Sequence, residues 1–149
     1  MTRENRNTLW QDAIEKEMLN VKVAFKITDR GEILVGYQEI ECHVVFDVKM
    51  EANFRRKARL VAGGHMTEAP VVSTYASAVS RDTVCITLTY TALNDLEVKG
   101  ANIQNTYISA PCKEKIFTKL RLEFGPNAGK YAIITRALYG LKSAGASFN

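Results

Sequence analysis

The chain has 149 residues, 46% of them hydrophobic and 24% charged, and it carries a net charge of +4 with a sequence pI near 9.0. This length suits one domain, which would bury roughly 70% of the surface of its unfolded chain. With only 3 Pro and 9 Gly, the composition excludes a fibrous or largely disordered chain. The mild positive charge permits nucleic acid or another polyanion as a partner without requiring one.

The three cysteines, Cys42, Cys85 and Cys112, stand far apart, and no C-x-x-C pair occurs. An odd number of isolated thiols predicts a reducing compartment and disfavours a zinc site. No apolar run approaches the roughly 20 residues that a membrane span needs, and we find no signal-peptide core. We therefore expect a soluble intracellular chain.

The first predicted element is a helix over residues 8–20. Thr8 and Gln11 have the spacing of a capping box, and Trp10 shares one helical face with Ile14. We expect Trp10 to anchor the core.

Short β-like runs follow at residues 21–27 and 33–35, with a turn signal at 29–31 between them. The next pattern is clearer, because alternation across residues 44–62 predicts an antiparallel hairpin. One face of this hairpin is apolar and the other is cationic.

Basic residues are concentrated in the hairpin, against the single acid Glu51: they are Lys49, Arg55, Arg56, Lys57 and Arg59. Two interpretations stay open. The charges either form an ordinary solvated face or clamp a polyphosphate or nucleic-acid backbone, for which Arg supplies paired donors and Lys a point charge.

Residues 63–79 are loop-like, and Gly63-Gly64 lacks the spacing of a phosphate-binding loop. His65 is expected at the surface. Residues 81–94 are ambiguous, because apolar residues alternate with a period of two, as in a strand. A cap at Ser80 and the i, i+4 stacking of apolar residues favour a helix.

Residues 96–101 predict a strand, which then runs into the amides Asn102, Gln104 and Asn105. Buried amides are costly unless each finds partners, so this polar cluster indicates a site or a site that has been lost.

Further strands are expected at residues 114–120 and 131–138, the second with Ile133 and Ile134 buried, and a turn-rich loop at 124–129. Residues 143–148 have the pattern of a helix start. A helix this short is marginal, so we interpret the chain end as a truncation.

Three segments occur in a characteristic order: Lys-Ala-Arg-Leu-Val-Ala-Gly-Gly at 57–64, Asn-Ile-Gln-Asn-Thr-Tyr-Ile at 102–108, and Arg-Ala-Leu-Tyr-Gly-Leu-Lys-Ser-Ala at 136–144. Together they resemble the reverse transcriptase domain of copia-type (pseudoviral) retrotransposon polyproteins. That family has approximately K-A-R-L-V-A-x-G, then D-I/V-x-x-A-Y/F-L, then A/S-L-Y-G-L-K-x-A. The resemblance runs from about Trp10 to the end of the chain and stops before the family's later Y/F-x-D-D motif.

The resemblance implies an α+β fingers-and-palm polymerase fold, with residues 1–149 as the N-terminal part of an RNA-directed DNA polymerase domain. The hairpin 44–62 would be the basic fingers, residues 81–149 a partial palm of antiparallel strands backed by helices, and 8–20 a leading helix. It also assigns residues 81–94 to a palm helix.

Polymerases of this kind hold two Mg²⁺ or Mn²⁺ ions about 4 Å apart on aspartates, and these ions drive nucleotidyl transfer to a primer. By the resemblance, the first aspartate of the family falls on Asn102. Glu97 imitates the motif, but only Asn102 has the family's spacing to Tyr107. An amide brings no negative charge, and the chain contains no Asp-Asp pair. We therefore expect no productive metal binding and no polymerisation.

The remaining family positions are intact, with Thr106 standing for the usual Ala. Tyr107 would lie beneath the sugar of the incoming nucleotide, or else be a palm core aromatic. The other nucleotide-binding residues that the resemblance implies, near the triphosphate or on the nucleotide and template side, are Lys49, Lys57, Arg59, Tyr139, Gly140 and Lys142.

The implied partners are a primed RNA or DNA template, a deoxynucleoside triphosphate and the remainder of the retrotransposon polyprotein, with no membrane. The implied location is a cytoplasmic particle or the nucleus. Three hypotheses follow: an inactive reverse transcriptase fragment, a non-catalytic nucleic-acid-binding remnant that uses the basic segment 49–59, and an inert decayed fragment. Steep salt dependence of binding would favour the second, and a broad melting transition the third.

Overall fold

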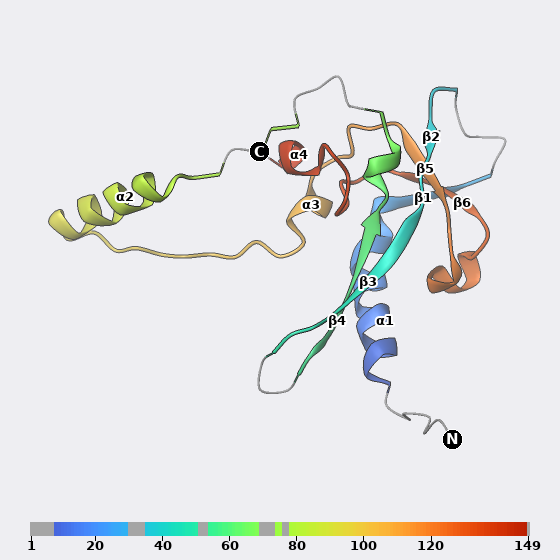
Figure 1. Ribbon diagram of the computed structural model, residues 1–149, viewed down its shortest axis with the longest axis horizontal. Coiled ribbons are helices and arrows are strands. Elements are labelled where there is room, and N and C mark those ends of the chain that lie inside the picture. Colours follow the sequence, from blue (N-terminus) through green and yellow to red (C-terminus); the bar gives the residue numbers. More distant parts are fainter. Residues whose placement is uncertain (1–7, 30–34, 51–53, 69–73, 76–77, 149) are drawn as a thin grey trace.

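The structure is a computed structural model that describes residues 8–29, 35–50, 54–68, 74–75 and 78–148. Its fold is α+β. A four-stranded sheet with the strand order β1-β6-β5-β2 stands beside a separate two-stranded hairpin, β3-β4 (Figure 1). The described residues include no helix that is long and apolar enough to cross a membrane.

Helix α1 (Leu9–Val21) packs along the hairpin and confirms the first predicted helix. Thr8 holds the N-cap position, but its hydroxyl donates to Asp12 Oδ2 at 3.0 Å instead of accepting from the backbone. Gln11 in turn donates to Glu15 Oε1 at 3.3 Å. The predicted capping box is therefore wrong, because both of its side chains prefer carboxylates one turn further on.

Three of the four strands of the larger sheet are antiparallel neighbours: β1 (Phe25–Thr28), β6 (Tyr131–Ile134) and β5 (Ile116–Lys119). The short β2 (Gln38–Glu39) runs parallel to β5 at the edge. Strands β1, β5 and β6 are shorter than the runs that the sequence predicts, and no strand was expected at the position of β2.

The other predictions on this sheet have mixed outcomes. Val21 ends the helix, and a 3₁₀ turn, Lys22–Ala24, precedes β1. The β-like run at 33–35 lies largely outside the described residues, and Val35 itself is in a turn. Ile134 is buried as predicted, but Ile133 is only half-buried. A 3₁₀ segment, Leu122–Asn127, lies where a loop was expected.

The hydrophobic core lies where α1, the sheet, the hairpin and the segment after β6 meet. Its largest fully buried side chains are Ile40, Leu60, Ile116, Leu138 and Val21. Trp10 lies outside this cluster, contrary to expectation: it is half-buried and packs edge-on against Phe46, with 5.1 Å between the ring centroids. Trp10 therefore joins α1 to the hairpin instead of anchoring the core.

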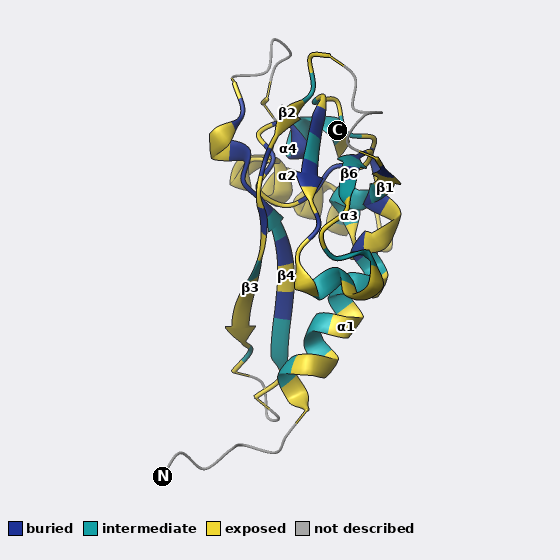
Figure 2. Ribbon diagram, turned by 90° about the vertical axis from the view of Figure 1, so that its right-hand side faces the viewer, coloured by how far each residue is buried: buried dark blue, intermediate teal, exposed yellow. Residues whose placement is uncertain are grey.

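The hairpin confirms the two-faced pattern. Strands β3 (Cys42–Val48) and β4 (Arg56–Ala62) are antiparallel, with Val44 opposite Leu60 and Val45 opposite Arg59. Residues directly opposite share a face, so the pairs Asp47–Lys57 and Val45–Arg59 lie on the side away from Leu60. Figure 2 shows the alternation along β4 as dark and light bands.

Helix α2 (Arg81–Leu93) settles the ambiguous segment as a helix. Ser80 Oγ caps it by accepting from the backbone N–H of Thr83 at 3.1 Å. No residue of α2 is buried, and in Figure 1 the helix extends away from the rest of the molecule. The expectation that this helix backs the palm strands is therefore wrong in this structure.

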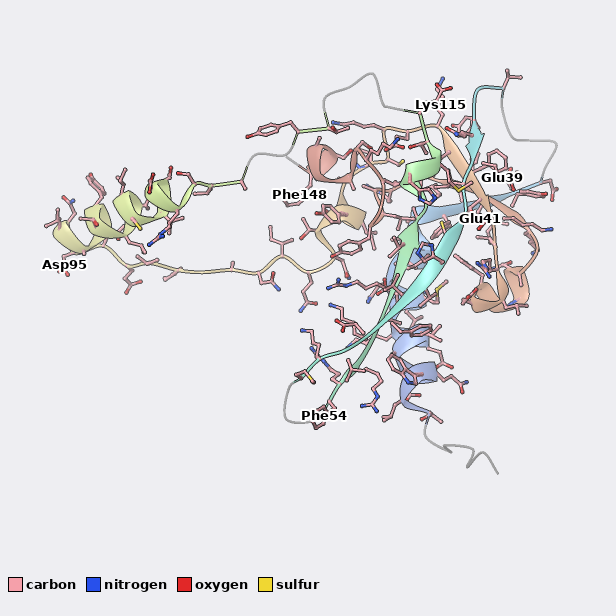
Figure 3. The ribbon with its side chains drawn as sticks, in the orientation of Figure 1. Glu39, Glu41, Phe54, Asp95, Lys115 and Phe148 are labelled. Atoms are coloured by element: carbon pink, nitrogen blue, oxygen red, sulfur yellow. The ribbon has the colours of Figure 1, made fainter. Side chains whose placement is uncertain are left out.

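The strand predicted at residues 96–101 is absent. Residues 92–105 are all exposed, and 95–105 return from α2 toward the body without joining a sheet (Figure 1). Asp95, where this return begins, lies at the far end of α2 (Figure 3). Asn105 has a φ of +54°, and helix α3 (Thr106–Ser109) begins directly after it. A strand needs a neighbour to accept its hydrogen bonds, and alternation alone supplies none.

Candidate nucleic-acid interface

Three side chains from the three sequence motifs meet in one place. The ring of Tyr139 packs edge-on against the ring of Tyr107, with 4.9 Å between the centroids. The guanidinium carbon of Arg59 lies over the same Tyr139 ring, 5.5 Å from its centroid. We name this group the Arg59–Tyr139–Tyr107 stack. It places a cation beside two aromatic rings, a combination that suits a nucleotide, which offers both phosphate and a flat base.

The turn that carries Tyr139 is attached to β4 by its backbone. Tyr139 O accepts from Ala62 N at 2.7 Å, and Val61 and Tyr139 form an isolated parallel bridge. Gly140 follows with a φ of +92°, and a Cβ there would lie 2.1 Å from Ala62 O. Gly140 is thus required by this close approach, a packing role that the resemblance did not assign.

Lys142 also has a structural partner. Its Nζ donates to the backbone carbonyl of Thr67, which belongs to the segment after β4. The ammonium therefore ties the turn to residue 67. The expectation that Lys142 lines the nucleotide side is not supported by this contact.

The cationic face of the hairpin lies next to the stack on the same strand. Register places Lys57 opposite Asp47 and Lys49 beside Arg55, whose carbonyl accepts from Lys49 N at 3.0 Å. Partial desolvation and then the neighbouring positive charges of Arg59 and Lys49 lower the pKa of Lys57. Cations that repel one another in this way favour the binding of an anion.

Arg56 does not contribute to the cationic face. Its guanidinium carbon lies 5.8 Å from the centroid of the Trp10 ring, and one of its nitrogens donates to Phe54 O. Because side chains alternate along β4, Arg56 points to the helix side of the hairpin. The predicted group of five basic residues is therefore divided between the two faces.

Glu17 is a residue of this region that sequence reasoning missed. Its Oε1 accepts from the backbone N–H of Leu60 at 3.0 Å, and its charge raises the pKa of Lys57, opposing the larger lowering effects. The sequence held a signal for this contact, because Glu17 interrupts the apolar helical face that contains Trp10 and Val21.

Asn102 joins no helix or strand, and in the part of the chain that the structure describes no hydrogen bond, ion pair or ring contact connects it to the stack or to the cationic face. It is exposed on the extended return from α2, five residues before Tyr107, and offers only a neutral amide. Among the described residues no three His, Cys, Asp or Glu side chains gather closely enough to hold a metal ion. A magnesium site usually needs at least one carboxylate, so the residues around position 102 do not fit the metal pair that the resembled family holds.

The three cysteines are free thiols, as expected. Burial raises the pKa of Cys42 and of Cys112 to about 11 each, whereas Cys85 is exposed on α2.

No protein-family model matches this chain, and no solved structure matches it.

Proposed function

We propose that this chain is part of a copia-type retrotransposon reverse transcriptase that binds primed or single-stranded nucleic acid without adding nucleotides to it. The fingers would correspond to β3-β4 and the partial palm to the segment from α2 onward. The remainder of the polyprotein would be a further partner, and a cytoplasmic particle or the nucleus its location.

The observation that carries this proposal is the Arg59–Tyr139–Tyr107 stack. Its three residues come from three motifs that are far apart in the sequence, and the resemblance implies a role in nucleotide recognition for a residue of each motif. An accidental likeness gives no reason for the three side chains to touch. The cationic face continues from Arg59 to Lys57 and supplies charge for a phosphate backbone.

The loss of catalysis rests on Asn102. Mg²⁺ or Mn²⁺ would have to supply the activation of the primer hydroxyl, and a neutral amide is a poor substitute for the aspartate of the family. In a primer-extension assay with either ion, we expect no nucleotide incorporation. We expect the same from Asn102→Asp, because this chain still lacks the Asp-Asp pair. Clear extension by the unmodified chain would contradict the proposal.

The binding step is tested by fluorescence anisotropy with a labelled primer-template at several salt concentrations. Each phosphate contact contributes about one unit to the slope of log affinity against log salt. The double variant Lys57→Ala/Arg59→Ala should therefore reduce this slope by about 2 and weaken binding at low salt.

The matched control is Lys16→Ala/Lys22→Ala, which removes the same charge from exposed positions of α1 and the turn after it. It should leave the slope within about 0.5 of the wild-type value, because only nearby phosphates release counterions. If the two double variants change the salt slope and the affinity equally, binding depends on net charge and not on the cationic face. Undetectable or salt-independent binding by the wild type would reject the proposed function.

A further inference from the structure

The segment before β5 holds the short helix α4 (Ala144–Phe148) at two points, at the residue that precedes it and at its middle residue. Glu114 Oε1 accepts from the backbone N–H of Ser143 at 3.1 Å and from its hydroxyl at 2.6 Å. Lys113 Nζ donates to the carbonyl of Ala146 at 3.3 Å. Negative charge at the start of a helix and positive charge near its carbonyl end both interact favourably with the helix dipole.

The Glu114 contact is costly to maintain. Ser143 is only 2% exposed, and the second carboxylate oxygen of Glu114, Oε2, is buried with no hydrogen-bond partner among the described residues. A carboxylate that is half-satisfied in a partly buried site loses hydration without full compensation. Its two bonds to Ser143 have a charged acceptor, and the one from the hydroxyl is short at 2.6 Å, so together they restrict the position of that residue.

Ser143 lies at the end of the turn that carries Tyr139. Leu141 N donates to Leu138 O at 3.3 Å, and Ala144 N donates to Leu141 O at 3.2 Å, so residues 138–144 form two consecutive turns. Leu138 and Leu141 are both buried. The β4 end of this unit is held at Ala62, and the other end is held by Glu114.

We propose that Glu114 is a positioning residue, which holds the 138–144 turns through Ser143 and thereby keeps the Tyr139 ring in the Arg59–Tyr139–Tyr107 stack. Because the stack is the interface of the proposed function, the consequence for binding rests on that function. The consequence for the position of the Tyr139 ring does not.

Two measurements test the proposal. The protein is labelled with 3-fluorotyrosine, and the ¹⁹F resonance of Tyr139 is assigned by its loss in Tyr139→Phe. Binding of a fluorescein-labelled single-stranded oligonucleotide is followed by anisotropy across a salt series. The variants are Glu114→Ala, which removes both bonds, and Glu114→Gln, which keeps a neutral acceptor. The control is Glu97→Ala, at an exposed position in the extended segment 95–105 that follows α2.

An effect of charge alone and a positioning role for Glu114 predict opposite changes in the affinity of Glu114→Ala. Removing a carboxylate near a polyanion site should tighten binding if electrostatics alone operates. If Glu114 positions Tyr139, Glu114→Ala instead shifts or broadens the Tyr139 resonance and weakens binding about 5–10-fold, with an unchanged salt slope, because a stacking contact is disturbed and no phosphate contact is removed. Glu114→Gln should recover most of the affinity, and Glu97→Ala should alter neither measurement.

An unshifted Tyr139 resonance in Glu114→Ala, or binding as tight as or tighter than wild type, overturns the proposal. If Glu114→Ala does not fold, Ser143→Ala is used in its place, because it removes only the hydroxyl bond. It should give a smaller shift of the Tyr139 resonance, and an unshifted resonance in Ser143→Ala overturns the proposal equally. If the wild type binds no oligonucleotide, the proposed function fails, and the Tyr139 resonance alone still decides whether Glu114 positions the ring.

Discussion

Replacing Gly140 by alanine should destabilise the protein far more than a single methyl group suggests. The new Cβ would lie 2.1 Å from Ala62 O and 2.8 Å from Val61 Cγ1. Neither neighbour can yield easily, because both belong to β4 and Ala62 is only 2% exposed. The turn itself would have to move away from the strand.

The cost has two parts. A residue with a Cβ pays about 1–2 kcal/mol for a left-handed conformation such as the +92° φ of Gly140. Moving the turn also stretches the 2.7 Å bond from Ala62 N to Tyr139 O, and an unsatisfied buried N–H costs about 1–3 kcal/mol. Together these give a loss of about 2–5 kcal/mol in the free energy of unfolding.

Urea unfolding followed by far-UV circular dichroism measures this loss, provided that the m-value is unchanged. Gly129→Ala is the matched control, since Gly129 has a φ of +84° with no atom within 4 Å of the added Cβ. It should lose only the conformational part, about 1–2 kcal/mol. Equal losses in the two variants would refute the steric reasoning and the claim that Gly140 is required by its approach to β4.

Three further outcomes are expected. Glu17→Ala should lower the free energy of unfolding in urea by about 1–3 kcal/mol, because it leaves the buried N–H of Leu60 without its acceptor. Glu17→Gln should recover most of this stability, and equal losses in the two variants would argue against the hydrogen bond. In the folded protein at pH 8, iodoacetamide should modify exposed Cys85 and spare Cys42, which is buried, and Cys112, which is half-buried, because the pKa of each of these two thiols is about 11. Rapid modification of all three, detected by mass spectrometry, would contradict this. The pKa values of Cys42 and Cys112 lie above the ordinary value of 9.0, so the unfolded chain loses its thiol protons at lower pH than the folded protein. The free energy of unfolding should therefore fall between pH 9 and pH 11, and the Cys42→Ala variant should show a smaller fall.

Several predictions succeeded because they depended on local periodicity. Alternating side chains along residues 44–62 were sufficient to place Leu60 and Arg59 on opposite faces of the hairpin. The cap at Ser80 likewise outweighed the period-two pattern that follows it, because a satisfied first turn stabilises the helical alternative.

The predictions that failed depended on more than local sequence. The strand expected at residues 96–101 had suitable residues but no neighbouring strand with which to pair, and Asn105 turns the chain into α3 instead. Trp10 was expected in the core because tryptophan is large and apolar, yet its ring packs at the edge of the hairpin, beside Phe46. Pairing partners and available space are properties of the assembled fold.

The sequence by itself determined the helix over α1, the two-faced hairpin and the concentration of positive charge on it, because side-chain periods of 3.6 and 2 act over a few neighbouring residues. Only the tertiary structure decided what each cation does. Arg59 joins Tyr139 and Tyr107, whereas Lys142 is bound to a carbonyl 75 positions away. These assignments depend on contacts between distant segments, which no local pattern contains.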